Sequence, residues 1–373
     1  MSLIQLLYEL RTRIEVELQE RYRWANRSNK DYGLEPRVFY GVKHLPKRDE
    51  DSGGGIIKTQ DLITRYPQCL VDPNLLYLVS SALPPYAARI AELARRFNGR
   101  VVLNQNGVAY PGWYGQGYGR VNKFLRNVIS QADLVIYQSE FCQRAADRFV
   151  GPAKGHTTIL YNPVDTTFFT PALREGLQNE IRLLVTGTHQ QAYRVRLGVE
   201  TLSYLMRRKG VEAQLIVSGR LAWKPESKTC QQDVFDWAKN AGVVEKIVMK
   251  GPYSQIHAPS IFRSADVLLH TTYNDACPRT VVEAMACGLP VVYSASGGVP
   301  ELVDEKSGIG VPVPEDWEHI HPPEASDLGD AVFNVLDSYN DRALAARRRA
   351  VDRFDTKFWL DRHKEWFDRV LSN

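Results

Sequence analysis

Short apolar runs alternate with longer stretches of helical periodicity along most of the chain. The runs are rich in β-branched and aliphatic residues, which is typical of strands buried on both faces of a parallel sheet. Strands that alternate with helices predict right-handed crossovers, and therefore an α/β fold with parallel sheets in both halves. The predicted strands cover residues 37–42, 75–80, 101–103, 134–138, 158–161, 182–187, 214–218, 246–249, 266–270 and 289–293.

The two ends of the chain predict helices. Residues 2–24 place apolar side chains at helical spacing, in a stripe narrow enough for a coiled-coil seam. A helix packed on its own domain accounts best for this stripe, while a dimer contact or a peripheral membrane contact through it stays open. Residues 354–371, which include Trp359, Trp366 and Phe367, predict a second amphipathic helix.

Length and composition indicate a soluble two-domain protein. The 373 residues exceed one ordinary core, and 44% hydrophobic with 24% charged residues is typical of globular proteins. The five cysteines and eight histidines are dispersed, so we expect a reducing compartment and no protein-held metal or cofactor. A net charge of +4, without a basic stripe, argues against nucleic acid.

No apolar run approaches the roughly 20 residues of a membrane span, and no signal peptide opens the chain. We therefore expect a cytoplasmic protein, with peripheral contact to the inner face of the membrane left open.

The stretch from Tyr273 to Glu301 carries the most chemistry. It predicts a polar loop, a short helix ended by Gly288, a buried strand, a glycine turn and the start of another helix. Two acids, Asp275 in the loop and Glu283 on the helix, stand eight positions apart. Both can face one cleft at the helix N-terminus, where backbone N–H groups attract phosphate.

This stretch resembles the retaining glycosyltransferases of family four, whose signature is an acid, seven residues and then Glu-Ala-Met-Ala-x-Gly-x-Pro-Val-Val. Residues 283–292 match the signature position for position, and 297–303 match the segment that follows it. The first acid is usually Glu in this family, and here it is the shorter Asp275. The resemblance implies a GT-B fold, with two Rossmann-like domains whose parallel sheets face a central cleft.

The resemblance implies acceptor-side and nucleotide-side positions in the first half of the chain. Gly54 and Gly55 correspond to a Gly-Gly loop that faces the cleft, and Asn106 stands where the family often has His. Residues 110–118 are rich in aromatics and glycine, so they read equally as an acceptor loop or as a loop pinned by packed rings. Asn162-Pro163-Val164-Asp165 matches the end of the family's first domain, so we expect the linker near 165–180.

In the second half, the family binds the donor diphosphate with Arg and Lys after a strand that ends in Gly, here Gly187. The Arg is absent, and Arg194 and Arg196 are the candidates for the Lys, because guanidinium can hold phosphate with two hydrogen bonds. Arg220, in Gly219-Arg220-Leu221, is a weaker candidate. The further expected nucleotide-sugar contacts are Lys250, Tyr253, Cys277, Pro278, Arg279, Thr280 and Glu283.

The sequence thus predicts a metal-independent retaining glycosyltransferase that moves a sugar from a nucleotide diphosphate-sugar, UDP-sugar favoured over GDP-mannose, to a glycan, lipid or small-molecule acceptor. Residues 1–170 would bind the acceptor, 180–350 the nucleotide-sugar, and the helix in 351–373 would cross back. Asp275, Glu283 and Arg194 are the expected catalytic residues. A weakly catalytic sugar-binding or scaffold subunit of a polysaccharide assembly complex, and a sugar-nucleotide epimerase, remain alternatives.

Overall fold

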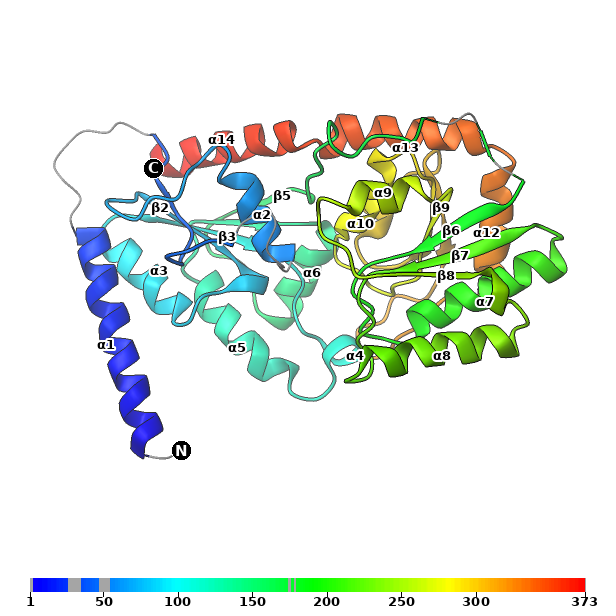
Figure 1. The fold of residues 1–373 in the computed structure, drawn as a ribbon. Helices are drawn as coiled ribbons and strands as arrows, with labels where there is room; N and C mark the ends of the chain where they lie inside the picture. The colour runs from blue at the N-terminus through cyan, green and yellow to red at the C-terminus, as the bar shows by residue number, and fades with distance from the viewer. Residues whose placement is uncertain (1–2, 26–34, 47–53, 174–175, 178, 373) are drawn as a thin grey trace. The chain divides into compact units, whose positions relative to one another are not determined.

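The computed structural model describes residues 3–25, 35–46, 54–173, 176–177 and 179–372 (Figure 1). It divides into two compact units, each described by itself below. Unit 1 comprises Met1–Tyr161 and Lys357–Asn373, and unit 2 comprises Asn162–Thr356. Unit 2 therefore starts a few residues before the linker expected at 165–180. Residues 47–53, which hold most of the loop before the predicted glycine helix, lie outside the described residues.

Unit 1 is built on a five-stranded parallel sheet in which neighbouring strands follow one another along the chain. The strands are β1 (Val38–Phe39), β2 (Leu75–Val79), β3 (Arg100–Gln105), β4 (Leu134–Tyr137) and β5 (His156–Ile159). The helices are α1 (Leu3–Ala25), α2 (Gly54–Leu62), α3 (Ala87–Arg96), α4 (Pro111–Tyr114), α5 (Tyr118–Ile129), α6 (Glu140–Phe149) and α14 (Thr356–Ser372). The aromatic segment 110–118, expected to be a loop, contains α4 and the start of α5.

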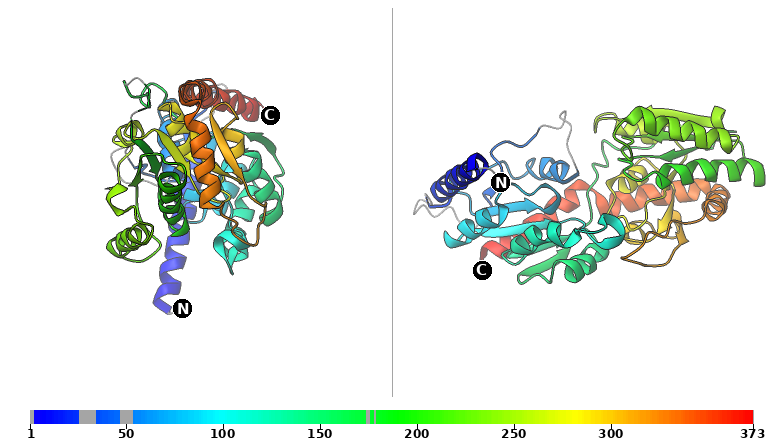
Figure 2. Two further views of the ribbon diagram at one scale, coloured as in Figure 1. Left: turned by 90° about the vertical axis from the view of Figure 1, so that its right-hand side faces the viewer. Right: turned by 90° about the horizontal axis from the view of Figure 1, so that it is seen from below.

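Helices cover both faces of the unit 1 sheet. The crossovers from β2 to β3 and from β3 to β4 progress in the same direction, so right-handedness puts α3 and α5 on one face. The opposite face is covered by α2 and α14, and Leu62 of α2 belongs to one core cluster with Trp359, Phe367 and Val370 of α14. The two further views in Figure 2 also place α14 along this sheet.

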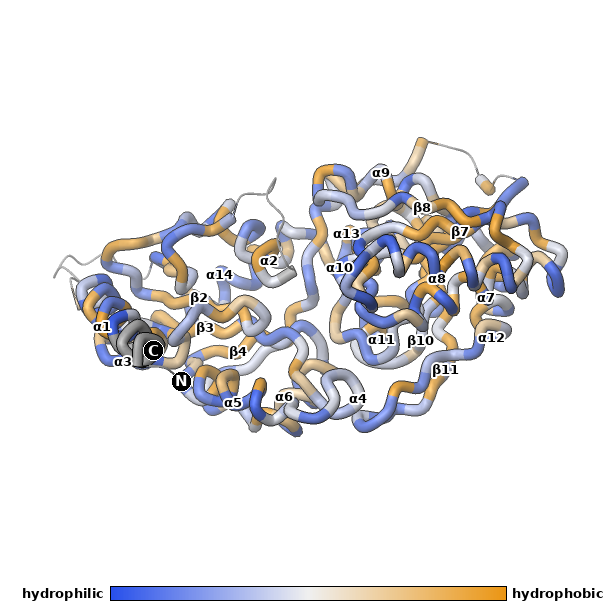
Figure 3. The backbone as a smooth tube through the Cα atoms, turned by 60° about the horizontal axis from the view of Figure 1, so that its bottom comes forward, coloured by the Kyte–Doolittle hydropathy of each residue, from blue (hydrophilic) through white to orange (hydrophobic). Residues whose placement is uncertain are grey.

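Unit 2 contains a six-stranded parallel sheet in the order β11-β10-β9-β6-β7-β8. Its strands are β6 (Ile181–Val185), β7 (Ala213–Ser218), β8 (Ile247–Gly251), β9 (Val267–His270), β10 (Val291–Ala295) and β11 (Gly308–Pro312). Its helices are α7 (Tyr193–Arg208), α8 (Ser227–Asn240), α9 (Ala258–Arg263), α10 (Arg279–Ala286), α11 (Val299–Leu302), α12 (Ala325–Leu336) and α13 (Tyr339–Phe354). The inner strands β6, β7, β9 and β10 are almost fully buried and largely hydrophobic (Figure 3), whereas the edge strands β8 and β11 are only partly buried.

The strand order of unit 2 reverses between β6 and β9. This is the order of a doubly wound sheet, in which the crossovers leave in opposite directions from the central pair. Ligands bind such sheets outside the carboxyl ends of the two strands at the reversal. The expected α/β architecture with two parallel sheets is therefore confirmed, and the fold directs attention to the loops that follow β6 and β9.

Helix α1 is fixed to unit 1 by its last turns. Trp24 is fully buried, and its Nε1 donates to Glu20 at 3.1 Å. Arg89 of α3 holds Glu17 with two hydrogen bonds of 2.6 Å. Further toward the N-terminus, Ile14 and Leu18 of the predicted stripe are 51% and 63% exposed. Among the described residues, no helix combines the length and the apolar character that crossing a bilayer would demand.

A buried chain of hydrogen bonds ties α14 to the sheet of unit 1. Nδ1 of His363 lies 2.9 Å from the carbonyl oxygen of Trp359, which can only accept, so this nitrogen carries the proton. Nε2 of His363 therefore accepts from the Tyr77 hydroxyl at 3.0 Å. The Tyr77 oxygen in turn accepts from Nδ2 of Asn104 at 3.1 Å. Because Nε2 of His363 acts as an acceptor in this chain, His363 is neutral.

This chain generates a prediction about stability at acidic pH. Burial lowers the pKa of His363 from 6.5 to about 3, and the hydrogen bond to Trp359 only partly opposes it. Between these values the unfolded chain binds a proton that the folded chain refuses, so stability is complete above pH 6.5 and falls as the pH drops. The free energy of unfolding should decrease by about 1.4 kcal/mol per pH unit for this histidine.

Denaturant titrations at pH 7.0 and 5.0 measure this dependence. His363→Gln, which keeps a donor and an acceptor but does not titrate, should remove one histidine's share of the loss. His44→Gln, at an exposed histidine of unit 1, should leave the loss unchanged. Equal pH dependence in the wild type and His363→Gln would contradict the prediction.

Candidate functional site

The carboxyl ends of three neighbouring strands of unit 2 are joined by backbone hydrogen bonds. The amide of His189, after β6, donates to the Arg220 carbonyl at 2.8 Å, and the Ala222 amide returns a bond of 2.9 Å to His189. The amide of Gly219, after β7, donates to the carbonyl of Gly251 at 2.7 Å. The three loops therefore form one continuous backbone surface at the edge where ligands bind parallel sheets.

Gly219 makes this close contact sterically feasible. Its φ is +95°, and an added Cβ would lie 2.0 Å from the carbonyl oxygen of Gly187. Any side chain at this position would therefore push the loops after β6 and β7 apart. Gly187 faces the start of α10, since a Cβ added there would lie 3.9 Å from both Cγ2 of Thr280 and an NH2 of Arg194.

His189 supports this edge as a neutral buried imidazole. It is fully buried, and Nε2 donates to the Ser218 carbonyl at 3.0 Å. Burial and the charge of Arg194 lower its pKa to about 3. His189 is therefore neutral at pH 7, and the positive charge near Gly187 comes from Arg194.

Arg194 and Arg196 lie two residues apart on α7 and point in different directions. The NH1 group of Arg194 donates to the carbonyl of Thr188 at 2.8 Å, which holds the guanidinium beside the Gly187 loop. Arg196 instead pairs with Glu200 at 2.8 Å, with 59% of its side chain exposed. Arg220 is also exposed, although its backbone belongs to the joined loops. Of the three arginines considered from sequence, Arg194 is the one held beside Gly187.

The loop that follows β9 is fastened to the start of α7. Thr271 donates through its hydroxyl to the Arg194 carbonyl at 2.8 Å, and the Tyr273 amide donates to the Tyr193 hydroxyl at 3.0 Å. These bonds bring the loops on both sides of the strand-order reversal together. They also place the charges of Arg194 and Asp275 where each affects the other's ionisation.

Asp275 is a partly buried acid in this loop. Oδ2 of Asp275 lies 3.2 Å from Nε2 of His270, the last residue of β9. Burial opposes the charge of Asp275, but His270 and Arg194 outweigh it and hold the pKa of Asp275 below its ordinary value. The carboxylate is therefore ionised at neutral pH and stays available to hydroxyl donors.

Glu283 lies on α10, one turn inside the helix. Only 4% of the residue is exposed, and Oε1 accepts from Nε2 of Gln255 at 3.0 Å and lies 3.5 Å from Nε of Arg279. Pro278 precedes the helix and offers no capping side chain. The Cys277 carbonyl accepts from Asn162, which anchors this turn within unit 2. The first turn of α10 therefore lies beside the Gly187 loop, and Glu283 follows one turn further along the helix.

The remaining predicted nucleotide contacts occupy the end of β8. Tyr253 donates to or accepts from the Thr186 hydroxyl at 2.9 Å, and burial together with Glu283 raises its pKa to about 12. Tyr253 therefore connects the β6 edge with the Glu283 side of the site. Lys250 is exposed on the same strand end.

Unit 1 holds a separate polar cluster at the carboxyl end of β3. Nζ of the buried Lys58 donates to Oδ1 of Asn104 at 3.0 Å and to Oδ1 of Asn106 at 3.1 Å. Asn106 also donates through Nδ2 to Ser81 at 2.6 Å. Gly55 allows α2 to approach, since a Cβ there would lie 2.5 Å from the Ser81 hydroxyl. Gly54 is the first residue of the same helix.

The aromatic segment 110–118 is packed at one end and exposed at the other. Tyr110 stacks on Phe149 with ring centroids 5.9 Å apart, so it pins the segment to α6. Trp113 and Tyr114 are 51% and 47% exposed. Part of the segment is thus packed, and part presents rings to solvent.

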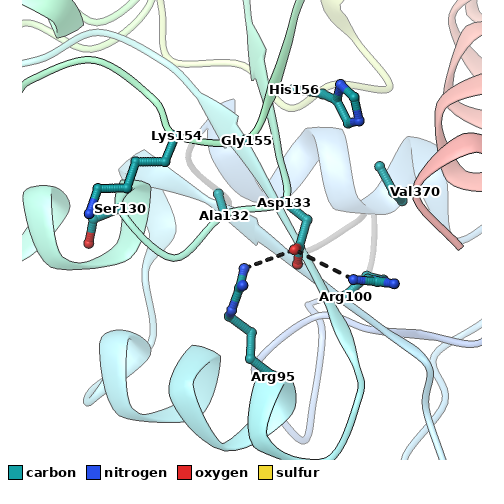
Figure 4. A pocket seen from close by; sticks show the side chains of 9 residues that line it. All are labelled: Arg95, Arg100, Ser130, Ala132, Asp133, Lys154, Gly155, His156 and Val370. Carbon is teal, nitrogen blue, oxygen red and sulfur yellow. Dashed lines mark hydrogen bonds and ion pairs between the residues drawn. The ribbon is translucent and has the colours of Figure 1, made fainter. Parts of the chain in front are cut away.

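A hollow of about 470 Å³ in unit 1 lies at the amino ends of the sheet strands, at the opposite end of the strands from the polar cluster around Lys58 (Figure 4). Its residues stand at the amino ends of β3, β4 and β5, away from the edge where parallel sheets bind ligands. Arg95 binds the Asp133 carboxylate at 2.8 Å, and Arg100 lies 3.9 Å from it. The same carboxylate accepts the Val101 amide at 2.8 Å, so we attribute these charges to closing the sheet edge.

Sequence reasoning missed three residues that contribute to these sites: Lys58, His270 and Gln255. Two of them carried a usable signal. His270 is a polar residue at the carboxyl end of an apolar strand, and Lys58 follows the glycines one turn into a helix. Gln255 carried none, because a glutamine in a loop has no distinctive spacing.

Solved structures that are similar to this chain define its fold class. A crystal structure of Anabaena HepE in complex with UDP superposes with a TM-score of 0.63 and 20% identity, over 80% of this chain and 79% of that one. Sucrose-phosphate synthase from Thermosynechococcus elongatus gives a TM-score of 0.62 and 18% identity, over 85% and 77%. At this level of identity the likeness shows the fold, and the fold is GT-B.

Residues 172–342, somewhat less than half of the chain, match the family model for glycosyl transferases group 1, so this part of the chain is similar to that family. Among curated relatives, a D-inositol 3-phosphate glycosyltransferase from Mycolicibacterium gilvum is 35% identical over 245 residues, covering 63% of this chain and 50% of that protein. The protein of that name from Mycobacteroides abscessus is 28% identical over 204 residues, covering 52% and 44%. The matched region spans about half the length of these relatives.

The contact at Gly219 generates a prediction about stability. Gly219→Ala should lower the free energy of unfolding more than Gly210→Ala, although both residues have positive φ. An added Cβ at Gly210 meets nothing within 4 Å, so only the backbone cost of about 1–2 kcal/mol applies. At Gly219 a clash with the Gly187 carbonyl adds about 1–3 kcal/mol. Denaturant titration of the two variants decides this, and equal losses would show that the loops can separate without cost.

Proposed function

We propose that this protein is a retaining glycosyltransferase that moves a sugar from a nucleotide diphosphate-sugar to a hydroxyl of a glycan, lipid or small-molecule acceptor. The observation that carries the proposal is the convergence of Arg194, Asp275 and the start of α10 at the strand-order reversal of unit 2. A cation, a helix N-terminus and an ionised acid at one sheet edge suit a diphosphate attached to a sugar.

Each group has a distinct proposed role. Glu283 accepts the ribose hydroxyls, and Asp275 orients the sugar by accepting its hydroxyls. Arg194, with backbone N–H groups near Arg279 and Thr280, neutralises charge on the leaving diphosphate. Lys250 and Tyr253, with the turn at Cys277 and Pro278, border the nucleotide. We assign no protein nucleophile, because in the resembled family the leaving phosphate assists attack on the same face.

The donor is proposed to be a UDP-sugar rather than GDP-mannose. Anabaena HepE was solved with UDP and with UDP-glucose, and the pneumococcal O-GlcNAc transferase GtfA with UDP and GlcNAc. The acceptor is assigned to unit 1, where the partly exposed Asn106 is held in place by the buried Lys58 and the exposed Trp113 offers an apolar sugar-stacking surface.

Donor turnover without acceptor tests the function. We expect the full chain to release UDP slowly from a UDP-sugar, with the rate unchanged by EDTA because Arg194 and α10 replace a metal. An epimerase would change the sugar, and a scaffold subunit would do neither. If the protein binds UDP-sugars but releases UDP from none of them, the scaffold alternative is favoured.

Variants of the two acids sharpen this test. Glu283→Ala should weaken free UDP by about tenfold to 150-fold for each ribose hydrogen bond lost. Asp275→Ala should leave UDP affinity unchanged in calorimetric titration and depress turnover, since only the sugar loses its partner. Equal losses of UDP affinity would refute the division of roles.

Arg194 and Arg196 provide a matched pair for the phosphate contact. Arg194→Ala should lower kcat by about 100-fold with a smaller change in KM, because charge on the diphosphate grows in the transition state. Arg196→Ala removes the same charge from the same helix but from its exposed face, so kcat should remain near the wild-type value. The reverse ranking in steady-state kinetics would move the phosphate contact to Arg196.

A further inference from the structure

Three side chains of metal-binding type converge in the segment between β11 and α12. Nε2 of His321 lies 2.8 Å from Oδ2 of Asp316, and Nδ1 of His319 lies 3.2 Å from the same oxygen. The three ligand atoms all lie within 4.8 Å of one another. The spacing is Asp-x-x-His-x-His, so the sequence argument from dispersed histidines overlooked it.

The backbone around Asp316 is held independently of this cluster. Its amide donates to the Tyr273 hydroxyl at 2.8 Å, and its carbonyl accepts from Nδ2 of Asn274 at 2.9 Å. Oδ1 of Asp316 accepts the Glu318 amide at 2.7 Å, which turns Oδ2 toward the two imidazoles. The adjacent Trp317 is buried. These hydrogen bonds orient the Asp316 carboxylate before any ion binds, which is the role that hydrogen bonds to metal ligands have in metal sites.

The imidazoles are placed to coordinate rather than only to form an ion pair. His321 packs against the ring of Tyr273 with centroids 6.0 Å apart, and His319 and His321 face the same carboxylate oxygen. Ligand atoms at about 2.0–2.1 Å from a tetrahedral zinc ion stand roughly 3.3 Å apart. The distances from Oδ2 of Asp316 to His321 and His319, 2.8 and 3.2 Å, are close to that separation.

We propose that Asp316, His319 and His321 form a binding site for a divalent transition-metal cation of the Zn²⁺ type. Two imidazoles and one carboxylate suit Zn²⁺ and its neighbours rather than Mg²⁺, which prefers oxygen ligands. Three protein ligands leave a fourth position to solvent. Side chains of His319 and His321 are 78% and 39% exposed, so the cation has direct access.

The proposed metal site is bonded to the loop that carries Asp275, but its three ligands are not among the residues proposed to contact the diphosphate. Tyr273 and Asn274, which immediately precede Asp275, hold the Asp316 backbone through three hydrogen bonds. A bound cation replaces the two imidazole contacts with coordinate bonds and fixes the 316–321 segment against Tyr273. The cation is therefore structural in this loop, and its removal by EDTA is compatible with continued donor turnover.

Calorimetric titration of the full, tag-free chain with ZnCl₂ tests the proposal after treatment with EDTA and dialysis. We expect saturable binding of one Zn²⁺ per chain, a raised unfolding midpoint and no comparable heat with MgCl₂. Co²⁺ bound at the same site should give visible absorption typical of a low-coordinate ion.

His321→Ala and His319→Ala remove one ligand each and should weaken Zn²⁺ by at least about tenfold. Both residues are partly or largely exposed, so the variants should fold, and thermal unfolding without metal checks this. His44→Ala removes an exposed histidine of unit 1 and should bind Zn²⁺ like the wild type. If the wild type shows no saturable binding, or if His321→Ala binds equally well, the three residues are a hydrogen-bonded cluster only and the proposal is wrong.

Discussion

The close backbone contact between Gly187 and Gly219 is the constraint on which the edge of the second sheet depends. Because a Cβ at Gly219 would reach within 2.0 Å of the Gly187 carbonyl, the loops after β6 and β7 can join only if that position is glycine. Their union positions the His189 backbone and buries its ring beside Arg194. A neutral His189 matters here, since a second cation would compete with Arg194 for any nearby anion.

The two units close the amino edges of their sheets in the same way. Asp133 precedes β4 and accepts the Val101 amide, and Asp266 precedes β9 and accepts the Arg182 amide, both at 2.8 Å. Each carboxylate is also held by arginine, at 2.8 Å for Arg95 and 3.0 Å for Arg182. Satisfied charges at the amino edge stabilise the sheet and leave nothing for a ligand.

The sequence was informative where hydrophobic pattern and motif coincide, and less so elsewhere. Every predicted strand exists, although 37–42 shortens to Val38–Phe39 before Gly41, whose φ is +77°. Helix α5 was missed because the glycine-rich start of its segment masks the apolar stripe that follows. The direction of Arg194 could not be derived from spacing, since it depends on the Thr188 carbonyl and on bonds to the loop after β9. The convergence of His319 and His321 on Asp316 likewise depends on how Tyr273 holds the backbone.

The end of the chain contributes to the core of the first unit. One face of the sheet receives α3 and α5, and the opposite face is covered by α2 together with α14. The cost of burying polar groups at this contact is offset by the chain from Trp359 through His363 and Tyr77 to Asn104. Lys58 ends that chain and also holds Asn106. The packing of the last helix and the geometry of the polar cluster at the end of β3 are therefore parts of one hydrogen-bonded network, so a change at His363 should alter the position of Asn106.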